Sequence, residues 1–403
     1  MSQPIDIQSP EFTADPGPAL ARARADGPLA EIAMPLVGRM LATTDDATAR
    51  EVLKDPRLLR DPEPATGKSL VRTYWWLPRF MAPLMHNMLA VDGEDHARLR
   101  RLVEDAFRRR AVERMRPRLE EMADGLLDAV DPAGAVDLVG AYARPLPLLA
   151  ICELLGMPEA DRRRVSRWIA PLSSPTGAVS FMRALPGLWR VMRHFRRDFE
   201  TVRRTGRPGL IRDLVEARAE GDRLSDDELL AMVVTLFVAG HETTVHLIGD
   251  AVLALLDDPE GARRALSYPA RLSLAIEEVL RFHSPVMMTK PLHAARDLEI
   301  GGRALRRGER VTALLVAANR DPARFEAPDE CRLDRRPNAH LTFGYGPHVC
   351  LGMQLARLEA HVALSRLFAR YPDLALAVPR DRVDMVRRAG IRGPAALPVR
   401  LAP

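Results

Sequence analysis

The chain has 403 residues, of which 47% are hydrophobic and 28% are charged, with a formal net charge of +5. These proportions are typical of a folded protein with an ample core. The small net charge, without a stripe of alternating basic and aromatic residues, argues against a nucleic-acid-binding function. Three cysteines with no close pair exclude a disulfide framework and a four-cysteine zinc site.

The N-terminus has neither the basic nor the apolar region of a targeting signal, so we expect a cytoplasmic protein. The most apolar segment, 229–256, is interrupted by His241, Glu242 and Asp250. Its longest uncharged run is too short to span a bilayer. We therefore expect no membrane contact, and interpret this segment as a buried core helix.

Taken in chain order, the first forty residues are rich in proline, alanine and glycine and predict an irregular lead-in. A long irregular insertion is predicted over 61–88, and loops of that size are often functional. Helical periodicity dominates elsewhere, with prolines such as Pro186 expected to break the stretch up to 220. The predicted helices are 45–54, 95–108, 110–129, 145–155, 158–169, a long central helix after Ser225, 259–266 and 270–282.

Short strands are predicted late in the chain, over 298–300, 310–315, 374–378 and 397–401. No internal repeat or low-complexity linker divides the sequence. The expected fold is therefore mainly α with minor β, in one domain over residues 1–403.

The most informative segment, 343–352, reads FGYGPHVCLG and contains Cys350. Its glycines permit tight turns and close approach to a flat ligand. A helix-like segment follows at once, and the free N–H groups of a helix start stabilise a thiolate. The pattern predicts an ionised cysteine that is the single protein ligand of a buried metal centre. A buried structural thiol is the alternative.

This segment resembles the haem-ligand loop of the cytochromes P450, and of the soluble bacterial members in particular. The matching residues are Phe343, Gly344, Gly346, His348, Cys350 and Gly352. The resemblance extends over essentially the whole chain. It implies the single-domain cytochrome P450 fold with a long central helix over the haem, haem b (iron protoporphyrin IX) as cofactor, and Cys350 as the iron ligand.

Small and polar residues interrupt the apolar run of the central helix at 239–244. Such residues are costly to bury unless they are paired or hydrated. The segment resembles the family's oxygen-activation motif. The resemblance implies that Ala239 and Gly240 open space over the haem, that Thr243 hydrogen-bonds the oxygen being activated, and that Glu242 relays protons. A buried helix with locally paired polar groups is the alternative.

His96 and Arg100 are four residues apart and project from one helix face. The helix resembles the one that binds the haem propionates in the family, with His348 as a third donor. A solvated basic face is the alternative. Where many members carry a propionate-binding arginine, this chain has Leu292, and Lys290 or His293 is the candidate to compensate.

Glu278 and Arg281 match the family's Glu-x-x-Arg ion pair, which braces the core behind the cysteine loop. The arginine that usually completes this network is absent from 328–331, and Arg332 is the candidate substitute. The resemblance also implies further haem contacts and a substrate pocket. The haem contacts are expected from Leu89, Ala239, Gly240, Phe343, Gly344 and Gly352, and the substrate contacts from Met88, Leu236, Val286, Met287 and Ile391.

These residues predict a haem-thiolate monooxygenase that inserts one oxygen atom from O2 into a hydrophobic small molecule, by hydroxylation and in secondary metabolism. No flavin or iron–sulfur segment is visible, so we expect electrons from a separate ferredoxin and its reductase, and a monomer. An arginine-rich surface near the thiolate would suit an acidic donor, or is merely solvated. It comprises Arg98, Arg101, Arg108, Arg109 and Arg110. The alternatives are a peroxide-driven peroxygenase, an enzyme that couples phenols, and a non-catalytic haem sensor.

Overall fold

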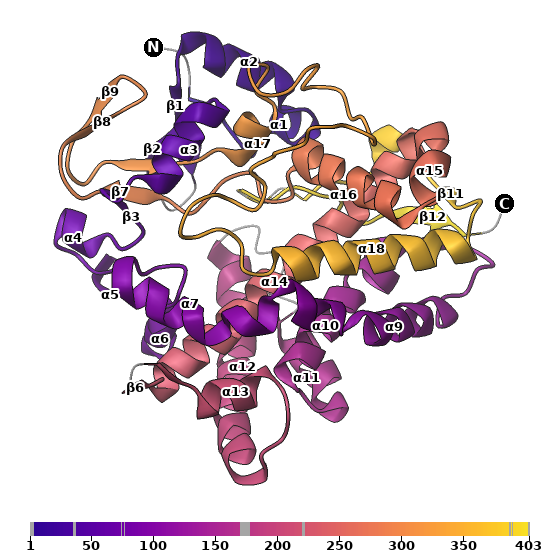
Figure 1. Cartoon of the computed structure of the whole chain (residues 1–403), viewed down its shortest axis with the longest axis horizontal. Coiled ribbons are helices and arrows are strands. Elements are labelled where there is room, and N and C mark those ends of the chain that lie inside the picture. Colours follow the sequence, from indigo (N-terminus) through magenta and orange to yellow (C-terminus); the bar gives the residue numbers. More distant parts are fainter. Residues whose placement is uncertain are drawn as a thin grey trace.

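The computed structural model describes residues 4–34, 38–73, 75, 77–169, 178–219, 222–386, 388 and 390–401. Helices form most of it, with small sheets at the periphery (Figure 1). The longer helices are α2 (Gly17–Asp26), α3 (Asp46–Lys54), α7 (Gly93–Phe107), α9 (Arg116–Asp128), α10 (Pro145–Leu155), α11 (Glu159–Ile169), α12 (Ala178–Thr205), α14 (Asp226–Asp257), α16 (Pro269–His283) and α18 (Met353–Arg370).

Short helical segments connect these elements. They are α1 (Pro10–Ala14), α4 (Glu63–Thr66), α5 (Leu70–Thr73), η1 (Arg79–Met81), α6 (Ala82–Met85), α8 (Arg109–Glu113), η2 (Val139–Ala143), α13 (Leu210–Glu216), α15 (Pro259–Leu266), α17 (Leu315–Asn319) and η4 (Arg380–Arg382). The strands are β1 (Leu29–Met34), β2 (Gly38–Thr43), β3 (Leu58–Leu59), β4 (Ala135–Asp137), β5 (Arg218–Ala219), β6 (Asp222–Arg223), β7 (Leu292–Ala294), β8 (Leu298–Ile300), β9 (Arg303–Leu305), β10 (Arg310–Thr312), β11 (Ala375–Leu376) and β12 (Pro398–Arg400).

Helix α14 is the centre of the core and passes through the middle of the molecule (Figure 1). It begins with a capping box, in which Ser225 Oγ accepts from the Glu228 amide and the Glu228 carboxylate accepts from the Ser225 amide. It is buried on nearly all sides, against α6, α10, α16 and α18 among others. In the described part of the chain it alone is long and apolar enough to cross a membrane, but 72% of its most apolar window is buried inside the protein. Its burial identifies it as a core helix.

The first forty residues are not an irregular lead-in, so that prediction is wrong. They form α1, α2 and the antiparallel β1–β2 pair, which joins a sheet of order β1-β2-β10-β7-β3. Strand β2 pairs in parallel with β10, where Leu41 faces Val311. The other neighbour of β2, β10, lies about 270 residues away along the chain, so local sequence does not show that the β1–β2 pair belongs to a larger sheet.

Prolines account for three further differences from the predicted elements. The insertion at 61–88 is not irregular throughout, because Pro64 and Pro83 lie in the first turns of short helices, where a missing N–H costs nothing. Pro186 lies inside α12 without ending it. The helix predicted over 110–129 is instead two helices, α8 and α9, with Pro117 in the first turn of α9. The other predicted helices and strands are present, with ends shifted by a few residues.

Candidate active site

A cavity of about 360 Å³ lies between α14 and the segment that contains Cys350. Most of the predicted site residues line it, although they come from distant parts of the sequence. These are Met88, Leu89, His96, Arg100, Leu236, Ala239, Gly240, Thr243, Val286, Phe343, Gly344, His348, Cys350 and Gly352. The fold therefore gathers the predicted haem and substrate contacts around one space.

The cysteine loop is held in shape by its backbone. Gly344 and Gly346 have φ angles of 74° and 76°, a region that favours glycine. A Cβ on Gly346 would lie 2.5 Å from the Leu53 carbonyl oxygen of α3, so this position has no room for a side chain. The Cys350 amide donates to the Phe343 carbonyl at 2.8 Å, which closes the loop just before α18 begins.

Burial raises the pKa of the Cys350 thiol, while the Gly352 amide and the charges of Arg100 and Arg357 act in the opposite direction. A thiol that ligates a metal ion is deprotonated by the bond itself. The Gly352 amide and the two arginines would add to that effect at Cys350.

The wall formed by α14 has the expected small and polar residues. Thr243 Oγ donates to the Ala239 carbonyl at 3.0 Å, one turn earlier. A Cβ on Gly240 would meet nothing closer than Ile151 Cδ1 at 3.7 Å, so the glycine widens the cavity and is not required by packing. Glu242 is buried but does not line the cavity.

The contacts of Glu242 are charged groups inside the protein. Its Oε1 lies 3.3 Å from His246 Nε2, and its Oε2 lies 3.5 Å from an Arg144 nitrogen. Burial acts to raise the pKa of Glu242, but His246 and then Arg144 outweigh it, and the pKa is lowered. This carboxyl is therefore held ionised beside the cavity.

Cationic and imidazole groups gather at another part of the cavity wall. The rings of His96 and His348 lie 4.0 Å apart, and His348 Nε2 lies 3.4 Å from Asp92 Oδ1. Burial and the positive neighbours His348 and Arg100 lower the pKa of His96 to about 4. An Arg100 nitrogen donates to the Val349 carbonyl at 2.8 Å, which ties α7 to the cysteine loop.

Sequence reasoning missed Arg60, which lies immediately before the insertion at 61–88 and belongs to no motif. Its Nη1 donates to the Lys290 carbonyl at 2.6 Å, and both side chains line the cavity. Burial lowers the pKa of Arg60 to about 10, although the charge of Asp92 acts in the opposite direction. Leu292 is buried in an apolar cluster and cannot donate to a propionate, and His293 does not line the cavity.

These residues fit a haem. One thiol lies in an otherwise largely apolar space, and nearby buried donors have no acceptor in the protein. Arg60 Nε and His348 Nδ1 are both buried without a hydrogen-bond partner. Two carboxylates would satisfy such donors by charge-assisted hydrogen bonds.

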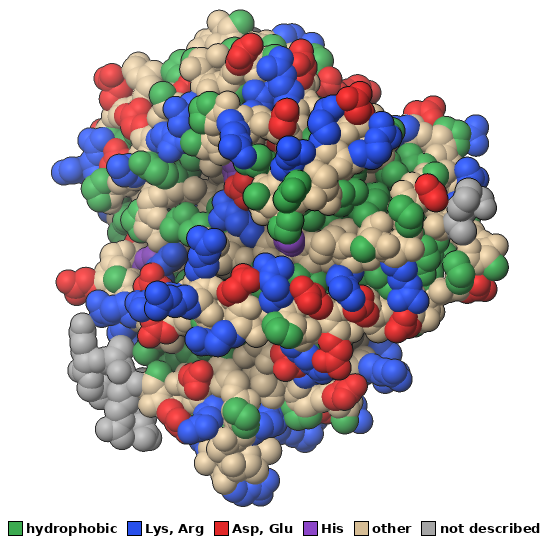
Figure 2. Space-filling model, turned by 45° about the vertical axis from the view of Figure 1, so that its right-hand side comes forward, with side chains coloured by type: hydrophobic (Ala, Val, Ile, Leu, Met, Phe, Trp, Pro, Cys, Tyr) green, Lys and Arg blue, Asp and Glu red, His purple; other side chains and the backbone are tan. Residues whose placement is uncertain are grey.

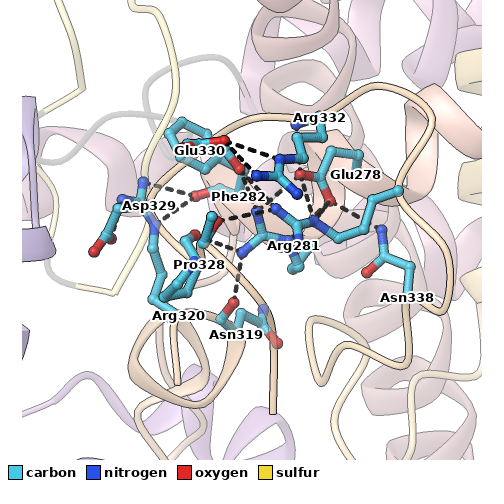
Figure 3. A network of polar contacts seen from close by, with 12 residues as sticks. Glu278, Arg281, Phe282, Asn319, Arg320, Pro328, Asp329, Glu330, Arg332 and Asn338 are labelled. Atoms are coloured by element: carbon cyan, nitrogen blue, oxygen red, sulfur yellow. Dashed lines mark hydrogen bonds and ion pairs between the residues drawn. The ribbon is translucent and has the colours of Figure 1, made fainter. Parts of the chain in front are cut away.

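The ion pair Glu278–Arg281 is fully buried, as expected (Figure 3). A second arginine, Arg335, joins it. Arg335 Nε donates to Glu278 Oε1 at 3.0 Å, and Asn338 donates to Oε2 at 3.0 Å. Arg332 contributes only its backbone amide, at 2.8 Å, because its side chain turns to Glu330. The prediction that the Arg332 side chain completes the network is wrong.

This network supports the cysteine loop. An Arg281 nitrogen donates to the Asn319 carbonyl at 2.9 Å (Figure 3). Asn319 Oδ1 in turn accepts from the Leu341 amide at 2.6 Å. Leu341 lies two residues before Phe343. The buried charges therefore fix the position at which the loop begins.

Two predicted substrate contacts do not line the cavity. Val286 and Met288 line the cavity, together with Pro285, Thr289 and Lys290 of the same segment. Met287 packs instead into the cluster beneath β1 and β2 and is 1% exposed. Ile391 forms a β-bridge with Val286 behind the wall. Met288 therefore takes the place predicted for Met287.

The predicted arginine-rich surface lies on α7 and α8, and it is partly paired. Arg98 forms an ion pair with Glu228, and Arg108 pairs with Asp105 at 3.0 Å. Basic and acidic side chains are interleaved across the face shown in Figure 2. The patch is therefore less one-sidedly positive than the sequence indicates.

Comparisons with known proteins agree with this geometry. A family model described as cytochrome P450 matches residues 189–266 and 271–376. The chain is 38% identical over 404 residues to the vitamin D(3) 25-hydroxylase of Pseudonocardia autotrophica, covering 99% of this chain and 96% of that one. It is 37% identical to the 6-deoxyerythronolide B hydroxylase of Saccharopolyspora erythraea, covering 98% of each.

The solved structure of the cytochrome P450 PksS of Bacillus subtilis 168 superposes with a TM-score of 0.90 at 33% identity, over 100% of both chains. The agreement extends from sequence to fold over the full length. The chain belongs to the cytochrome P450 family.

Proposed function

We propose that this cytochrome P450 hydroxylates an apolar secondary metabolite in the cavity between the Cys350 loop and α14. The observation that carries the proposal is that Cys350, the Ala239–Thr243 wall and a largely apolar remainder line one space. When bound, haem b supplies the activation of O2, which the thiolate ligand promotes. The protein supplies the ligand, the proton path and the orientation of the substrate.

The cofactor would be held by Cys350 at the iron and by hydrogen-bond donors at its carboxylates. We assign the donors as His96, Arg100 and His348, with Arg60 and Lys290 in place of the usual arginine. Phe343, Gly344 and Gly352 from the loop, and Leu89, Ala239 and Gly240 from the other walls, would contact the macrocycle.

The proton path is assigned to Glu242 and Thr243. Thr243 Oγ lines the cavity and can give its hydrogen bond to the oxygen being activated instead of to the Ala239 carbonyl. Glu242 lies one residue away from Thr243. It contacts Arg144, whose side chain is 29% exposed, so Arg144 connects Glu242 to the surface. A proton taken up at Glu242 would thus reach the cavity through Thr243.

The substrate would contact Met88, Leu236, Val286 and Met288. Methionines adapt their shape to irregular apolar ligands. The names of the relatives support a bulky apolar substrate, because they include a vitamin D(3) 25-hydroxylase, a 6-deoxyerythronolide B hydroxylase and a mycinamicin IV hydroxylase/epoxidase. We propose hydroxylation of an unactivated carbon as the reaction.

Electrons would come from a ferredoxin that docks near α7 and α8, close to the cysteine loop. We further propose that the protein is a cytoplasmic monomer with a single domain over residues 1–403. These assignments rest on the family and on the sequence, and analytical ultracentrifugation with and without a ferredoxin tests the monomer and the partner together.

The test of the haem-thiolate site is spectroscopic. The reduced protein with carbon monoxide is expected to show the red-shifted Soret band of a thiolate-ligated haem, and Cys350→Ser is expected to abolish it. Cys152→Ser, at a buried cysteine away from the cavity, is the matched control. An unshifted band in the wild type contradicts the proposal. Turnover driven by peroxide alone would favour a peroxygenase, and spectral binding without turnover would favour a sensor.

A further inference from the structure

Three buried ionisable residues form a stripe along α14 that leads away from the cavity. Glu242, His246 and Asp250 are spaced four residues apart, so their side chains lie one above the other on the same face. His246 and Asp250 are both 0% exposed. In an otherwise apolar helix, such a stripe is costly unless its members interact.

The stripe is not satisfied by ordinary hydrogen bonds. The two carboxylate oxygens of Glu242, both ring nitrogens of His246 and both carboxylate oxygens of Asp250 are buried without a hydrogen-bond partner. Glu242 lies 3.3 Å from His246 Nε2 and 3.5 Å from an Arg144 nitrogen, and Asp250 Oδ1 lies 3.6 Å from His283 Nδ1. Groups held this close in a low-dielectric interior interact mainly through charge and shared protons.

The protein makes room for the His246 ring. Gly393, with φ at 154°, packs directly on it, and a Cβ there would lie 2.5 Å from His246 Cβ and 2.6 Å from Nδ1. The adjacent Pro394 packs equally closely on Gly249 of α14. The turn that carries these residues therefore fixes the ring with Nε2 toward Glu242, 3.3 Å from Oε1.

We propose that His246 is the proton partner of Glu242, so that the acid of the oxygen-activation motif is a carboxylate–imidazole pair that shares one proton. His246 acts through Glu242 and is thus a positioning residue. The shared proton moves from His246 Nε2 to Glu242 Oε1 and from Glu242 onward to the cavity, which leaves a neutral imidazole beside a carboxylate. The pair regains a proton from solvent past Arg144. The inference rests on the proposed role of Glu242.

The charged surroundings of the pair come from every element packed against it. They are Arg144 before α10, His241 and Asp250 on α14, His283 on α16, Glu359 on α18, and Arg392 and Arg380 near the C-terminal turn. Glu359 lies beside Thr244 of α14. Burial raises the pKa of Asp250, while the charges of Arg392 and His246 act to lower it. Arg392, which donates to His283 Nδ1 at 3.1 Å, limits this effect.

The direct test follows the imidazole itself. Holoprotein labelled with 15N-histidine, in the diamagnetic reduced carbon-monoxide form, is titrated by NMR, and the His246 signals are assigned by their loss in His246→Gln. Glu242→Gln is expected to move the titration midpoint of the ring to lower pH by about one to three pH units, because the carboxylate that favours the charged form is gone. Glu359→Gln, at a buried acid beside α14, is the matched control and is expected to leave the midpoint in place.

An unmoved midpoint in Glu242→Gln overturns the proposal, and so does a wild-type ring that stays neutral throughout. A second measurement is the pH profile of NADPH oxidation with a surrogate ferredoxin and reductase. The wild-type rate is expected to fall as pH rises and the pair loses its proton, and His246→Gln is expected to lack this alkaline limb. His194→Gln, at a half-buried histidine of α12, is expected to keep it. A normal thiolate Soret band in all variants would show that the haem site is intact, which separates failure of this inference from failure of the proposed function.

Discussion

Arg335 Nε lies 3.0 Å from Glu278 Oε1, so a second arginine joins Arg281 at a carboxylate that is completely excluded from solvent. The pairing links the segment before the cysteine loop to α16. Since Glu278 also receives the Arg332 amide, the carboxylate has donors on both oxygens. A network of this kind is stable only while every member is present.

Replacing Arg335 is therefore expected to be far more damaging than replacing Arg332. Arg335→Met removes one of the two arginines at the buried Glu278 carboxylate, leaving Arg281, and is expected to cost about 3 kcal/mol in the free energy of unfolding. Arg332→Met removes an exposed contact with Glu330 and is expected to cost less than about 1 kcal/mol. Urea unfolding of the holoprotein measures both. An equal loss of unfolding free energy in both variants would show that the Arg332 side chain also stabilises the network.

Arg60 and Lys290 are expected to hold the cofactor. Arg60→Met and Lys290→Met each remove a cationic donor, which is worth about 1.5–3 kcal/mol when it bonds a charged acceptor. Haem transfer to excess apomyoglobin is therefore expected to become about 10- to 100-fold faster in each variant. Arg72→Met, at an exposed arginine of α5, is the matched control. Unchanged rates in both cavity variants would remove them from the cofactor site.

Thr243 is expected to control where the electrons go. Thr243→Ala keeps the shape of α14 and is expected to retain haem and the thiolate Soret band, because the hydrogen bond that it removes is to the Ala239 carbonyl on the same helix. The share of reducing equivalents released as peroxide is expected to rise, since the proton donor is missing. Thr235→Ala, two turns earlier on the same wall, is the control. Equal peroxide release from both would contradict the assignment.

Asp250 is expected to make stability depend on pH. Burial raises the pKa of this carboxyl from 3.8 to about 6. Between these values the folded state binds more protons than the unfolded state, so stability falls as pH rises through the interval. Asp250→Asn has no such loss, and its advantage over the wild type is expected to grow by on the order of 2 kcal/mol from about pH 4 to about pH 7. Thermal unfolding of the two proteins across this range measures the difference, and parallel curves would contradict it.

The sequence was sufficient for the features that depend on neighbours along the chain. The glycines around Cys350, the apolar run of α14 and the pair Glu278–Arg281 are all local patterns, and each lies where it was predicted. The family resemblance then placed them around one cofactor.

What the sequence did not predict depends on contacts between distant segments. Arg60 meets Lys290 only because β3 pairs with β7. Arg335 reaches Glu278 across 57 positions, and Arg332 was a plausible rival until the direction of its side chain was known. The sequence also could not tell which of Met287 and Met288 lines the cavity, because that depends on the local path of the backbone.

The contacts of Arg392 have a practical consequence for engineering the N-terminus. Its guanidinium donates to the carbonyls of Thr13 at 2.9 Å and Ala14 at 3.0 Å, and it also donates to His283, next to Asp250. A version of the protein shortened beyond α1 would lose these two carbonyl acceptors. The Arg392 guanidinium would then interact mainly with His283, beside Asp250 at the far end of the α14 stripe. Affinity tags at this end are therefore safest when they precede α1, and deletions into it are expected to alter proton handling at a site far away in the sequence.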